Sequence, residues 1–302
     1  MRIAGTGASG FLGRYLVARL TEQGHDCRCW YRPNSDRAGI DAAEGRIDWL
    51  PGELGDADAG RALVEGCDAV VHAALYRAGA GFTGAEGDLA EFVKKNVLGT
   101  IRLIEAARTA GVKRFVFIAT CAVHDRILDD RPLDEAHPLW PFSHYGAHKA
   151  AIEKFVHSYG LGQGYGICSL RPTGIYGLAH PVTKSKWFGL VQAVKAGQEV
   201  RCGGGGKEVH AADVARAVEI LLLAPAAKIT GEAFNCYDMY ISDYDVATIA
   251  KELSGSKAEI VGEPKQPKHQ IETGKLRALG MEFGGRPLLE ETIRQMLAHA
   301  SG

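Results

Sequence analysis

The chain begins with a short apolar run, a glycine-rich turn and an amphipathic helical pattern, in the segment IAGTGASGFLGRYLVARL. Glycine has no Cβ, so it allows a sharp turn, a close approach of backbone to phosphate and tight packing of helix on strand. The helix N-terminus adds free N–H groups and a partial positive charge. This order of elements predicts a dinucleotide-binding turn rather than a purely structural one. Two frames fit, Gly5-x-Gly7-x-x-Gly10 and Gly7-x-x-Gly10-x-x-Gly13.

Short apolar runs alternate with helical patterns through the first half of the chain, as in successive βαβ units. We therefore predict an α/β fold, a doubly wound (Rossmann) parallel sheet with a smaller C-terminal substrate lobe. The rhythm loosens after Arg171, and the glycine run Gly203–Gly206 is expected to be a flexible loop. The predicted dinucleotide-binding domain comprises residues 1–172 and 209–238, and the predicted substrate-binding lobe comprises residues 173–208 and 239–302.

Composition excludes several other classes of protein. The 302 residues carry a formal net charge of -1, so no overall charge favours nucleic acid. The longest apolar run is too short to span a membrane, and the N-terminus does not resemble an export signal. Seven cysteines without a C-x-x-C pair argue against a zinc site or a disulfide framework. We expect a cytoplasmic protein with a small-molecule substrate and no metal.

The segment that follows the second predicted strand, CRCWYRPNSDR, bears on the choice of cofactor. A carboxylate at this point would bind the 2′-hydroxyl of the adenosine ribose, whereas an arginine suits a 2′-phosphate. Arg32 lies there and no acid precedes it, so NADP is favoured over NAD. An ordinary solvated arginine would leave the cofactor open.

Tyr145 and Lys149 lie four residues apart in a helical segment, so both side chains can face one bound molecule. A free tyrosine is a poor base near neutral pH, and a nearby ammonium would lower its pKa. Thr120 adds a hydroxyl at the end of a predicted strand, the edge where open α/β sheets bind ligands. The spacing alone is also met by chance in many helices, and a threonine there is often only a cap.

Taken together, these motifs resemble the extended short-chain dehydrogenases/reductases of the epimerase/dehydratase branch. The resemblance covers nearly the whole chain, and its motifs are the glycines, NVLGT from Asn96, KRFVFIAT ending at Thr120, Tyr145-x-x-x-Lys149, RPTGIYG from Arg171, VHAADVA from Val209 and LRALGMEF. It selects the frame of Gly7, Gly10 and Gly13. It implies that Tyr145 is the general acid/base, that Lys149 lowers the pKa of Tyr145 and binds the nicotinamide ribose, and that Thr120 orients the reacting oxygen.

The same resemblance implies a larger set of site residues. Asn96 should support the catalytic helix from within the core. The implied cofactor-binding residues are Gly7, Ser9, Gly10, Phe11, Leu12, Gly13, Arg32, Glu53, Leu54, Ala73, Ala74, Asn96, Tyr145, Lys149, Arg171, Pro172 and Thr173. The candidate substrate-binding residues are His124, Gly174, Lys184 and Lys207. The histidines near the predicted site are expected on the surface or behind the site rather than at a metal.

The chain departs from the sugar-nucleotide members of this family at three positions. Gly174 stands where these members commonly have a substrate-contacting asparagine, Gly206 where an arginine often holds the diphosphate, and Glu53 where an aspartate is usual at the adenine. The leading prediction is an NAD(P)-dependent oxidoreductase or epimerase that uses a sugar nucleotide or a related substrate. The alternatives are a simple reductase or dehydrogenase of a steroid-like or other apolar alcohol or ketone, and a non-catalytic NADP-sensing protein. The family resemblance also implies a homodimer.

Overall fold

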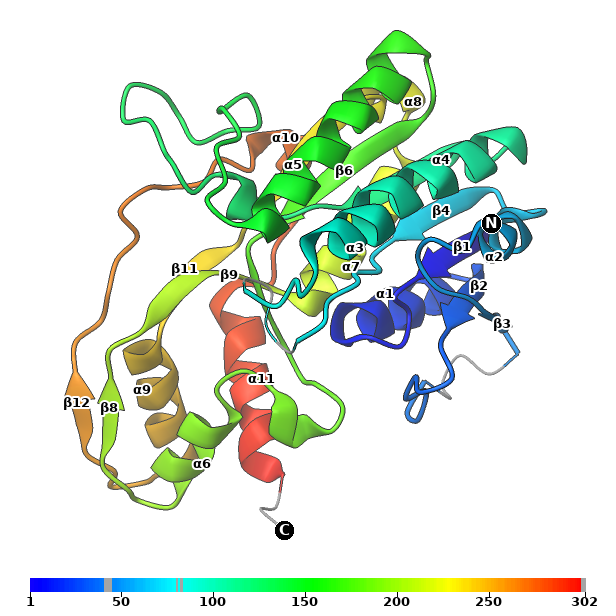
Figure 1. The fold of residues 1–302 in the computed structure, drawn as a ribbon. Coiled ribbons are helices and arrows are strands. Elements are labelled where there is room, and N and C mark those ends of the chain that lie inside the picture. Colours follow the sequence, from blue (N-terminus) through cyan, green and yellow to red (C-terminus); the bar gives the residue numbers. More distant parts are fainter. Residues whose placement is uncertain (41–44, 80, 82–83, 300–302) are drawn as a thin grey trace. The chain divides into compact units, whose positions relative to one another are not determined.

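The computed structural model describes residues 1–40, 45–79, 81 and 84–299. In this part of the chain, a parallel sheet of seven strands has the order β10-β6-β5-β4-β1-β2-β3 (Figure 1). The strands are β1 (Arg2–Thr6), β2 (Asp26–Tyr31), β3 (Ile47–Pro51), β4 (Ala69–His72), β5 (Arg114–Ile118), β6 (Ile167–Pro172) and β10 (Glu232–Cys236). The strand order reverses between β1 and β4, the kind of switch point at which open α/β sheets bind ligands. The predicted doubly wound fold is confirmed.

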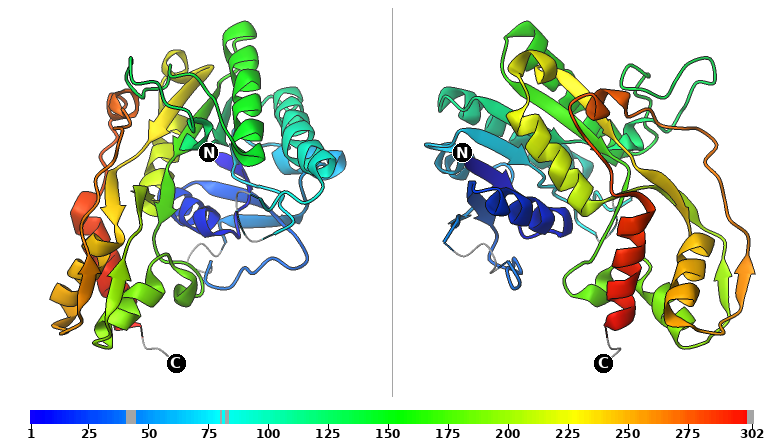
Figure 2. Two further views of the ribbon diagram at one scale, coloured as in Figure 1. Left: turned by 60° about the vertical axis from the view of Figure 1, so that its left-hand side comes forward. Right: turned by 180° about the vertical axis from the view of Figure 1, so that it is seen from behind.

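Helices cover both faces of this sheet. Figure 1 shows α4 and α5 side by side over one face, and the view from behind in Figure 2 shows α1 and α7 over the other. The bounds are α1 (Phe11–Glu22), α2 (Ala57–Val64), α3 (Leu89–Val93), α4 (Gly99–Thr109), α5 (His144–His157), α7 (Ala211–Leu223) and α8 (Ala226–Ile229). Residues 89–109 form one interrupted helical segment, in which a π-helical turn, η2 (Lys94–Leu98), joins α3 to α4. A second π-helical turn, η4 (Ser158–Gly162), follows α5.

The strands of the large sheet are nearly free of exposed side chains where they cross its centre. All residues of β4 and β6 are buried, as are Phe115–Ile118 of β5. Their apolar side chains meet the inner faces of α4 and α5, where Leu103, Ile104 and Ile152 are buried. Burial on both faces explains why these strands read as continuous apolar runs rather than as alternating patterns.

Residues group by contact into two units. Unit 1 comprises Met1–Pro172, Val214–Cys236 and Ile271–Met281, and unit 2 comprises Thr173–Asp213, Tyr237–Gln270 and Glu282–Gly302. The boundary after Pro172 is the one used in the prediction. Residues 271–281 group with unit 1, although the prediction placed them in the C-terminal lobe, because Lys275 of α10 (Gly274–Arg277) bonds to Glu232 and Ala233 of β10. Residues 209–213 group with unit 2.

Unit 2 contains two small sheets. Strand β9 (Gly205–His210) lies between β11 (Met239–Ser242) and β7 (Gly174–Tyr176), and β8 (Val200–Cys202) pairs with β12 (Ile260–Gly262). Its helices are α6 (Phe188–Lys195), α9 (Asp243–Ser254) and α11 (Gly285–Ala298), which surround a separate apolar core with Val191, Ile249 and Ile293. Two short 3₁₀ turns are η3 (Cys121–Val123) in unit 1 and η5 (Val182–Lys184) in unit 2.

The glycine run in unit 2 differs from the prediction. The expected flexible loop Gly203–Gly206 is half strand, because β9 begins at Gly205. A Cβ on Gly205 would lie 2.6 Å from the hydroxyl of Tyr240, and one on Gly206 would lie 2.6 Å from Oε1 of Glu208. Here glycine makes room for larger side chains beside the strand, which local composition alone does not reveal. Among the described residues, no helix has both the length and the apolarity to cross a membrane.

Candidate active site

The glycine turn connects the carboxyl end of β1 to α1. It lies next to the point between β1 and β4 where the strand order reverses. Gly7 has φ +76°, a backbone conformation that favours glycine, and a Cβ there would lie 2.9 Å from the backbone of Ala73 and Ala74. A Cβ on Gly13 would lie 2.7 Å from Cα of Ala8. The first turn of α1 follows Gly10 directly, so its N–H groups lack intrahelical partners. Gly7 and Gly13 are thus held by backbone contacts within the turn, whereas Gly5 lies inside β1, where a Cβ would lie 3.0 Å from Sγ of Cys29.

The turn is tied to the end of β4 by a buried histidine that sequence reasoning missed. Nδ1 of His72 lies 2.6 Å from Oγ1 of Thr6, and Nε2 lies 2.8 Å from Oγ1 of Thr100. Thr6 in turn accepts a hydrogen bond of 3.1 Å from the N–H of Ala74. Burial lowers the pKa of His72 to about 3, so the ring is neutral and serves as a fixed bridge.

The end of β2 carries the residues predicted to select the cofactor. Arg32 is exposed, and its backbone N–H bonds to Oγ of Ser35 at 2.9 Å. The guanidinium of Arg37 stacks 4.5 Å from the ring of Tyr31. Glu53, beyond β3, is exposed with Lys95 3.4 Å away, whereas Leu54 is buried in the core. Arg32 and Glu53 are thus both exposed, and Arg32 is the one that lies at the end of β2.

Thr120 and Tyr145 meet at the carboxyl end of β5. Thr120 is buried and caps η3 by accepting a hydrogen bond from the N–H of Ala122. Tyr145 lies in the first turn of α5, which begins after Ser143 caps the N–H of Gly146. Burial raises the pKa of Tyr145, against a hydrogen bond with Thr120 and the charge of Arg77, which both lower it. The two predicted hydroxyls are therefore in contact, and the phenol is protonated near neutral pH.

Lys149 is buried one turn further along α5. Its Nζ donates a 2.6 Å hydrogen bond to the carbonyl of Ile118, the last residue of β5, and lies 4.6 Å from the ring centre of Phe117. Burial lowers the pKa of Lys149 to about 7, against the charge of Glu153, which raises it. Lys149 thus holds α5 on the end of β5, and part of its population is uncharged near neutral pH. The predicted effect of Lys149 on the pKa of Tyr145 stays a prediction.

Asn96 lies in the π-helical turn η2 and is buried. Its Oδ1 accepts from the N–H of Tyr76 at 2.8 Å, and its Nδ2 donates to the carbonyls of Tyr76 at 2.9 Å and Phe92 at 3.1 Å. These bonds secure the segment that leaves β4, close in sequence to Ala73 and Ala74. In the structure, the side chain of Asn96 therefore holds this segment, and its predicted support of the catalytic helix stays a prediction.

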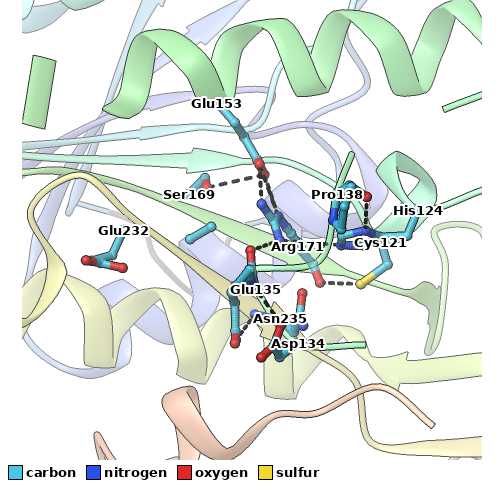
Figure 3. Close-up of polar contacts among 12 residues, drawn as sticks. Cys121, His124, Asp134, Glu135, Pro138, Glu153, Ser169, Arg171, Glu232 and Asn235 are labelled. Carbon is cyan, nitrogen blue, oxygen red and sulfur yellow. Dashed lines mark hydrogen bonds and ion pairs between the residues drawn. The ribbon is translucent and has the colours of Figure 1, made fainter. Parts of the chain in front are cut away.

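Arg171 is at the end of β6, and its side chain is buried within unit 1 rather than open to a ligand (Figure 3). Its guanidinium bonds to Glu153 of α5 from Nε at 2.8 Å and from Nη2 at 2.6 Å, and both side chains are at most 1% exposed. Nη1 donates to the carbonyl of Glu135 at 3.2 Å. Ser169 bonds to the same carboxylate at 3.3 Å. The pair fastens α5, which carries Tyr145, to the sheet.

His124 also belongs to this buried cluster (Figure 3). Its Nε2 lies 3.4 Å from Nη1 of Arg171, and its Nδ1 lies 3.3 Å from the carbonyl of Pro138. Burial lowers the pKa of His124 to about 4. The histidines were expected on the surface or behind the site. His144 is exposed, whereas His124, His148 and His210 are buried. Each of the two ring nitrogens of His124 therefore has a partner within unit 1.

The remaining predicted substrate residues belong to unit 2. Gly174 begins β7, Lys184 is exposed in η5, and Lys207 is partly buried in β9. Pro172 ends β6, and the next residue, Thr173, has a buried hydroxyl without a hydrogen-bond partner among the described residues. Sequence reasoning overlooked Glu208, a buried carboxylate on β9 that directly precedes the motif VHAADVA. In the described part of the chain, no group of three or more histidine, cysteine or acidic residues is arranged to hold a metal.

The residues at the glycine turn fit a dinucleotide. The turn has no Cβ where Gly7 passes over the backbone after β4, and α1 begins directly after Gly10 with no side-chain cap on its first N–H groups. A Cβ on Gly7 or Gly13 would clash with the protein's own backbone, so this turn packs as it does only with glycine, as dinucleotide-binding turns require.

Comparison with known proteins agrees with this geometry. A model of the NAD-dependent epimerase/dehydratase family matches residues 5–236. A 4-hydroxy-2-methyl-3-oxo-4-farnesyl-3,4-dihydroquinoline-1-oxide ketoreductase of Stigmatella aurantiaca is 32% identical over 272 residues, covering 88% of this chain and 77% of the relative. A 3-beta-hydroxysteroid dehydrogenase of Mycolicibacterium neoaurum is 31% identical over 198 residues, covering 64% of this chain and 52% of the relative. This chain thus spans about half of the dehydrogenase's length.

Among solved structures, the UDP-glucose 4-epimerase of Thermotoga maritima with UDP-glucose has a TM-score of 0.78 at 22% identity, covering 98% of this chain and 97% of the other. A dTDP-glucose 4,6-dehydratase of Streptomyces venezuelae has a TM-score of 0.77 at 24% identity, covering 97% and 96%. At these identities the likeness concerns the fold. The extent of the family match and the ketoreductase relative together show that this chain belongs to the NAD-dependent epimerase/dehydratase family and is an enzyme of that family.

Proposed function

We propose that this protein is an NADP(H)-dependent reductase or dehydrogenase that interconverts a ketone and a secondary alcohol. The observation that carries the proposal is the hydrogen bond between Tyr145 and Thr120 at the carboxyl end of β5. Two hydroxyls that are 25 residues apart in sequence (145 − 120) meet, and the buried amine of Lys149, one turn further along α5, bonds to the carbonyl of Ile118 at the end of β5. A non-catalytic NADP-sensing protein would not need this arrangement.

Gly7, Gly10 and Gly13 would hold the pyrophosphate with the N–H groups of α1, and Lys149 would hold the nicotinamide ribose. The bound nicotinamide nucleotide supplies the redox chemistry by accepting or donating a hydride. Arg32 would pair with the 2′-phosphate of NADP, because its side chain is exposed beyond β2. This choice of NADP over NAD remains a proposal.

Tyr145 would transfer the proton. Its raised pKa keeps the phenol protonated near neutral pH, which suits donation of a proton to the oxygen of a ketone during reduction. Thr120 shares a hydrogen bond with the phenol and would fix the same oxygen in line with it. Lys149, with a pKa of about 7 before a ligand is present, would become charged more readily beside an anionic or hydroxyl-rich cofactor.

The proposed substrate is an apolar or uncharged ketone rather than a sugar nucleotide. Two relatives named as a ketoreductase and a 3-beta-hydroxysteroid dehydrogenase support this choice. Glycine at positions 174 and 206 supports it too, since these positions lack the side chains that the family resemblance associates with a nucleoside diphosphate. The earlier leading prediction, an epimerase or oxidoreductase of sugar nucleotides, is the alternative that substrate tests must exclude.

The test combines a substrate screen with one variant. Purified protein would be mixed with NADPH or NADH and a panel of ketones and UDP-sugars, and the loss of reduced-cofactor absorbance would be followed. We expect turnover of ketones with NADPH, and Tyr145→Phe should lower kcat by about 10²- to 10⁴-fold while the Kd for NADPH stays unchanged. Tyr244→Phe, on α9 of unit 2, is the matched control. Full activity in Tyr145→Phe would contradict the mechanism.

Two further proposals concern the setting of the enzyme. We expect a homodimer through α4 and α5, since Leu98, Phe155 and Leu161 near these helices are exposed. Sedimentation equilibrium would measure the mass. A cytoplasmic location is supported by the seven cysteines, all of which are free thiols.

A further inference from the structure

Glu208 is a carboxylate buried in unit 2, away from the motifs of the nucleotide site. It lies on β9, the middle strand of the three-stranded sheet, and is 3% exposed. Position 208 pairs with Gly174 of β7 on one side and with Met239 of β11 on the other. Acidic side chains are almost never fully buried unless they have a function or a complete set of partners.

Two glycines leave the space that this carboxylate occupies. A Cβ on Gly174 would lie 2.6 Å from Oε2 and 2.8 Å from Oε1 of Glu208. A Cβ on Gly206, two residues earlier on the same strand face, would lie 2.6 Å from Oε1. No side chain larger than hydrogen fits at either position while the carboxylate stays in place. Two of the three departures seen in the sequence, Gly174 and Gly206, therefore belong to one structural feature, the placement of the Glu208 carboxylate against β7 and β9.

The carboxylate has only part of its hydrogen-bonding capacity satisfied. Oε1 forms an ion pair with Nζ of Lys186, whose side chain is 41% exposed. Oε2 is buried without a hydrogen-bond partner among the residues that the structure describes. Burial raises the pKa of Glu208. The positive charge of Lys186 and its hydrogen bond to the carboxylate act in the opposite direction and lower it. A buried acceptor without a partner costs about 1–3 kcal/mol, so a donor supplied by a ligand would be favoured there.

We propose that Glu208, with Lys186, is a specificity-determining subsite of unit 2 that binds a hydroxyl of an uncharged substrate and excludes a nucleoside diphosphate. A substrate hydroxyl would donate to Oε2, which has the free acceptor capacity. A diphosphate would meet a buried negative charge that only one lysine offsets, and like charges brought together cost binding energy. This inference rests on the proposed function, because it names the class of ketone or alcohol that the enzyme accepts.

The first experiment uses UDP as the probe of anion exclusion, by calorimetric titration of the NADPH-bound enzyme. The wild-type protein should bind UDP with a Kd above about 1 mM. Glu208→Gln keeps the shape of the side chain and removes its charge, so it should bind UDP at least about tenfold more tightly. Glu199→Gln removes one exposed carboxylate from unit 2 and is the matched control, with no change expected.

Three results would overturn the proposal: UDP bound by the wild type with micromolar affinity, a gain in Glu208→Gln no larger than that in Glu199→Gln, or no detectable binding by Glu208→Gln. Thermal melting would show whether Glu208→Gln folds. If Glu208→Gln does not fold, Glu208→Met, which is of similar size and also uncharged, takes its place in the same titration.

The second experiment compares pairs of ketones that differ by one hydroxyl distant from the carbonyl. Glu208→Gln should raise KM at least about fivefold for the hydroxylated member, leave kcat within about twofold, and leave KM for its partner unchanged. Equal effects on both members would contradict a hydroxyl subsite. If neither variant nor wild type reduces any ketone, the proposed function fails, whereas the UDP titration still decides the exclusion of anions.

Discussion

The ion pair between Arg171 and Glu153 provides the sharpest test of how α5 is held on the sheet. Arg171→Met would remove the three short hydrogen bonds from Nε and Nη2 and the bond from Nη1 to the carbonyl of Glu135. Glu153 would remain with Ser169 at 3.3 Å as its hydrogen-bond donor. Its carboxylate would then be a buried and nearly unpaired charge.

Removing one partner of a fully buried ion pair costs about 3–5 kcal/mol of the free energy of unfolding. At about 2 °C per kcal/mol for a chain of this length, the melting temperature of unit 1 should fall by about 6–10 °C. Most of this loss comes from the orphaned carboxylate rather than from the lost attraction. The double variant Arg171→Met/Glu153→Leu, which has no orphaned charge, should therefore regain at least about 2 kcal/mol.

The measurement is differential scanning calorimetry of the wild type, both single variants and the double variant, supported by urea unfolding. Arg61→Met is the control, because Arg61 pairs with Asp58 on the exposed surface of α2 and such pairs contribute about 0–1 kcal/mol. A cost below about 1 kcal/mol for Arg171→Met, or a double variant whose loss equals the sum of the single losses, would refute this account of the pair.

Two other predictions follow from the same structure. Gly13→Ala should abolish NADPH binding measured by fluorescence titration, because its Cβ would lie 2.7 Å from Cα of Ala8, whereas Gly60→Ala in α2 has open space and should bind normally; normal binding by both would contradict the packing argument. Burial lowers the pKa of His72 and His148 to about 3 from the ordinary 6.5, so between these values the unfolded chain binds more protons than the folded one. Stability should therefore fall as the pH drops from about 6.5 toward 3, and calorimetry of His148→Phe should show a smaller fall; an unchanged fall would show that His148 does not contribute.

Much of the fold could be predicted because its signals are local. The glycine turn and the apolar runs each lie within about 20 residues of sequence, and the elements form where these patterns stand. The π-helical turn at Asn96 escaped prediction, since one added residue in a helical turn leaves the apolar periodicity almost intact. The strand at Gly205 escaped for another reason: its glycines accommodate Tyr240 and Glu208, which depends on pairing partners rather than on local propensity.

The residues of the candidate site also fall into two groups, those that a local sequence pattern indicates and those whose surroundings depend on tertiary contacts. The four-residue spacing of Tyr145 and Lys149 stands in the sequence, whereas the contact of Tyr145 with Thr120 depends on the placement of β5 next to the start of α5. The environments of Arg171 and His124 could not be predicted, because Glu153 and Glu135 reach them from distant segments. Tertiary contacts give the side chain of Arg171, a predicted cofactor-binding residue, the further role of fastening α5, and they alone connect Gly174 and Gly206 to Glu208.

The path of the chain between the two units limits how the enzyme can be re-engineered. The backbone passes from one unit to the other after residues 172, 213, 236, 270 and 281, so neither unit is a continuous piece of polypeptide. A chimera that exchanges unit 2 must replace three separate segments at once, and a truncation after residue 172 would also remove two segments of unit 1. Under the role proposed for Glu208, point substitutions on β7 and β9 are a simpler route to new substrate preferences than domain grafting.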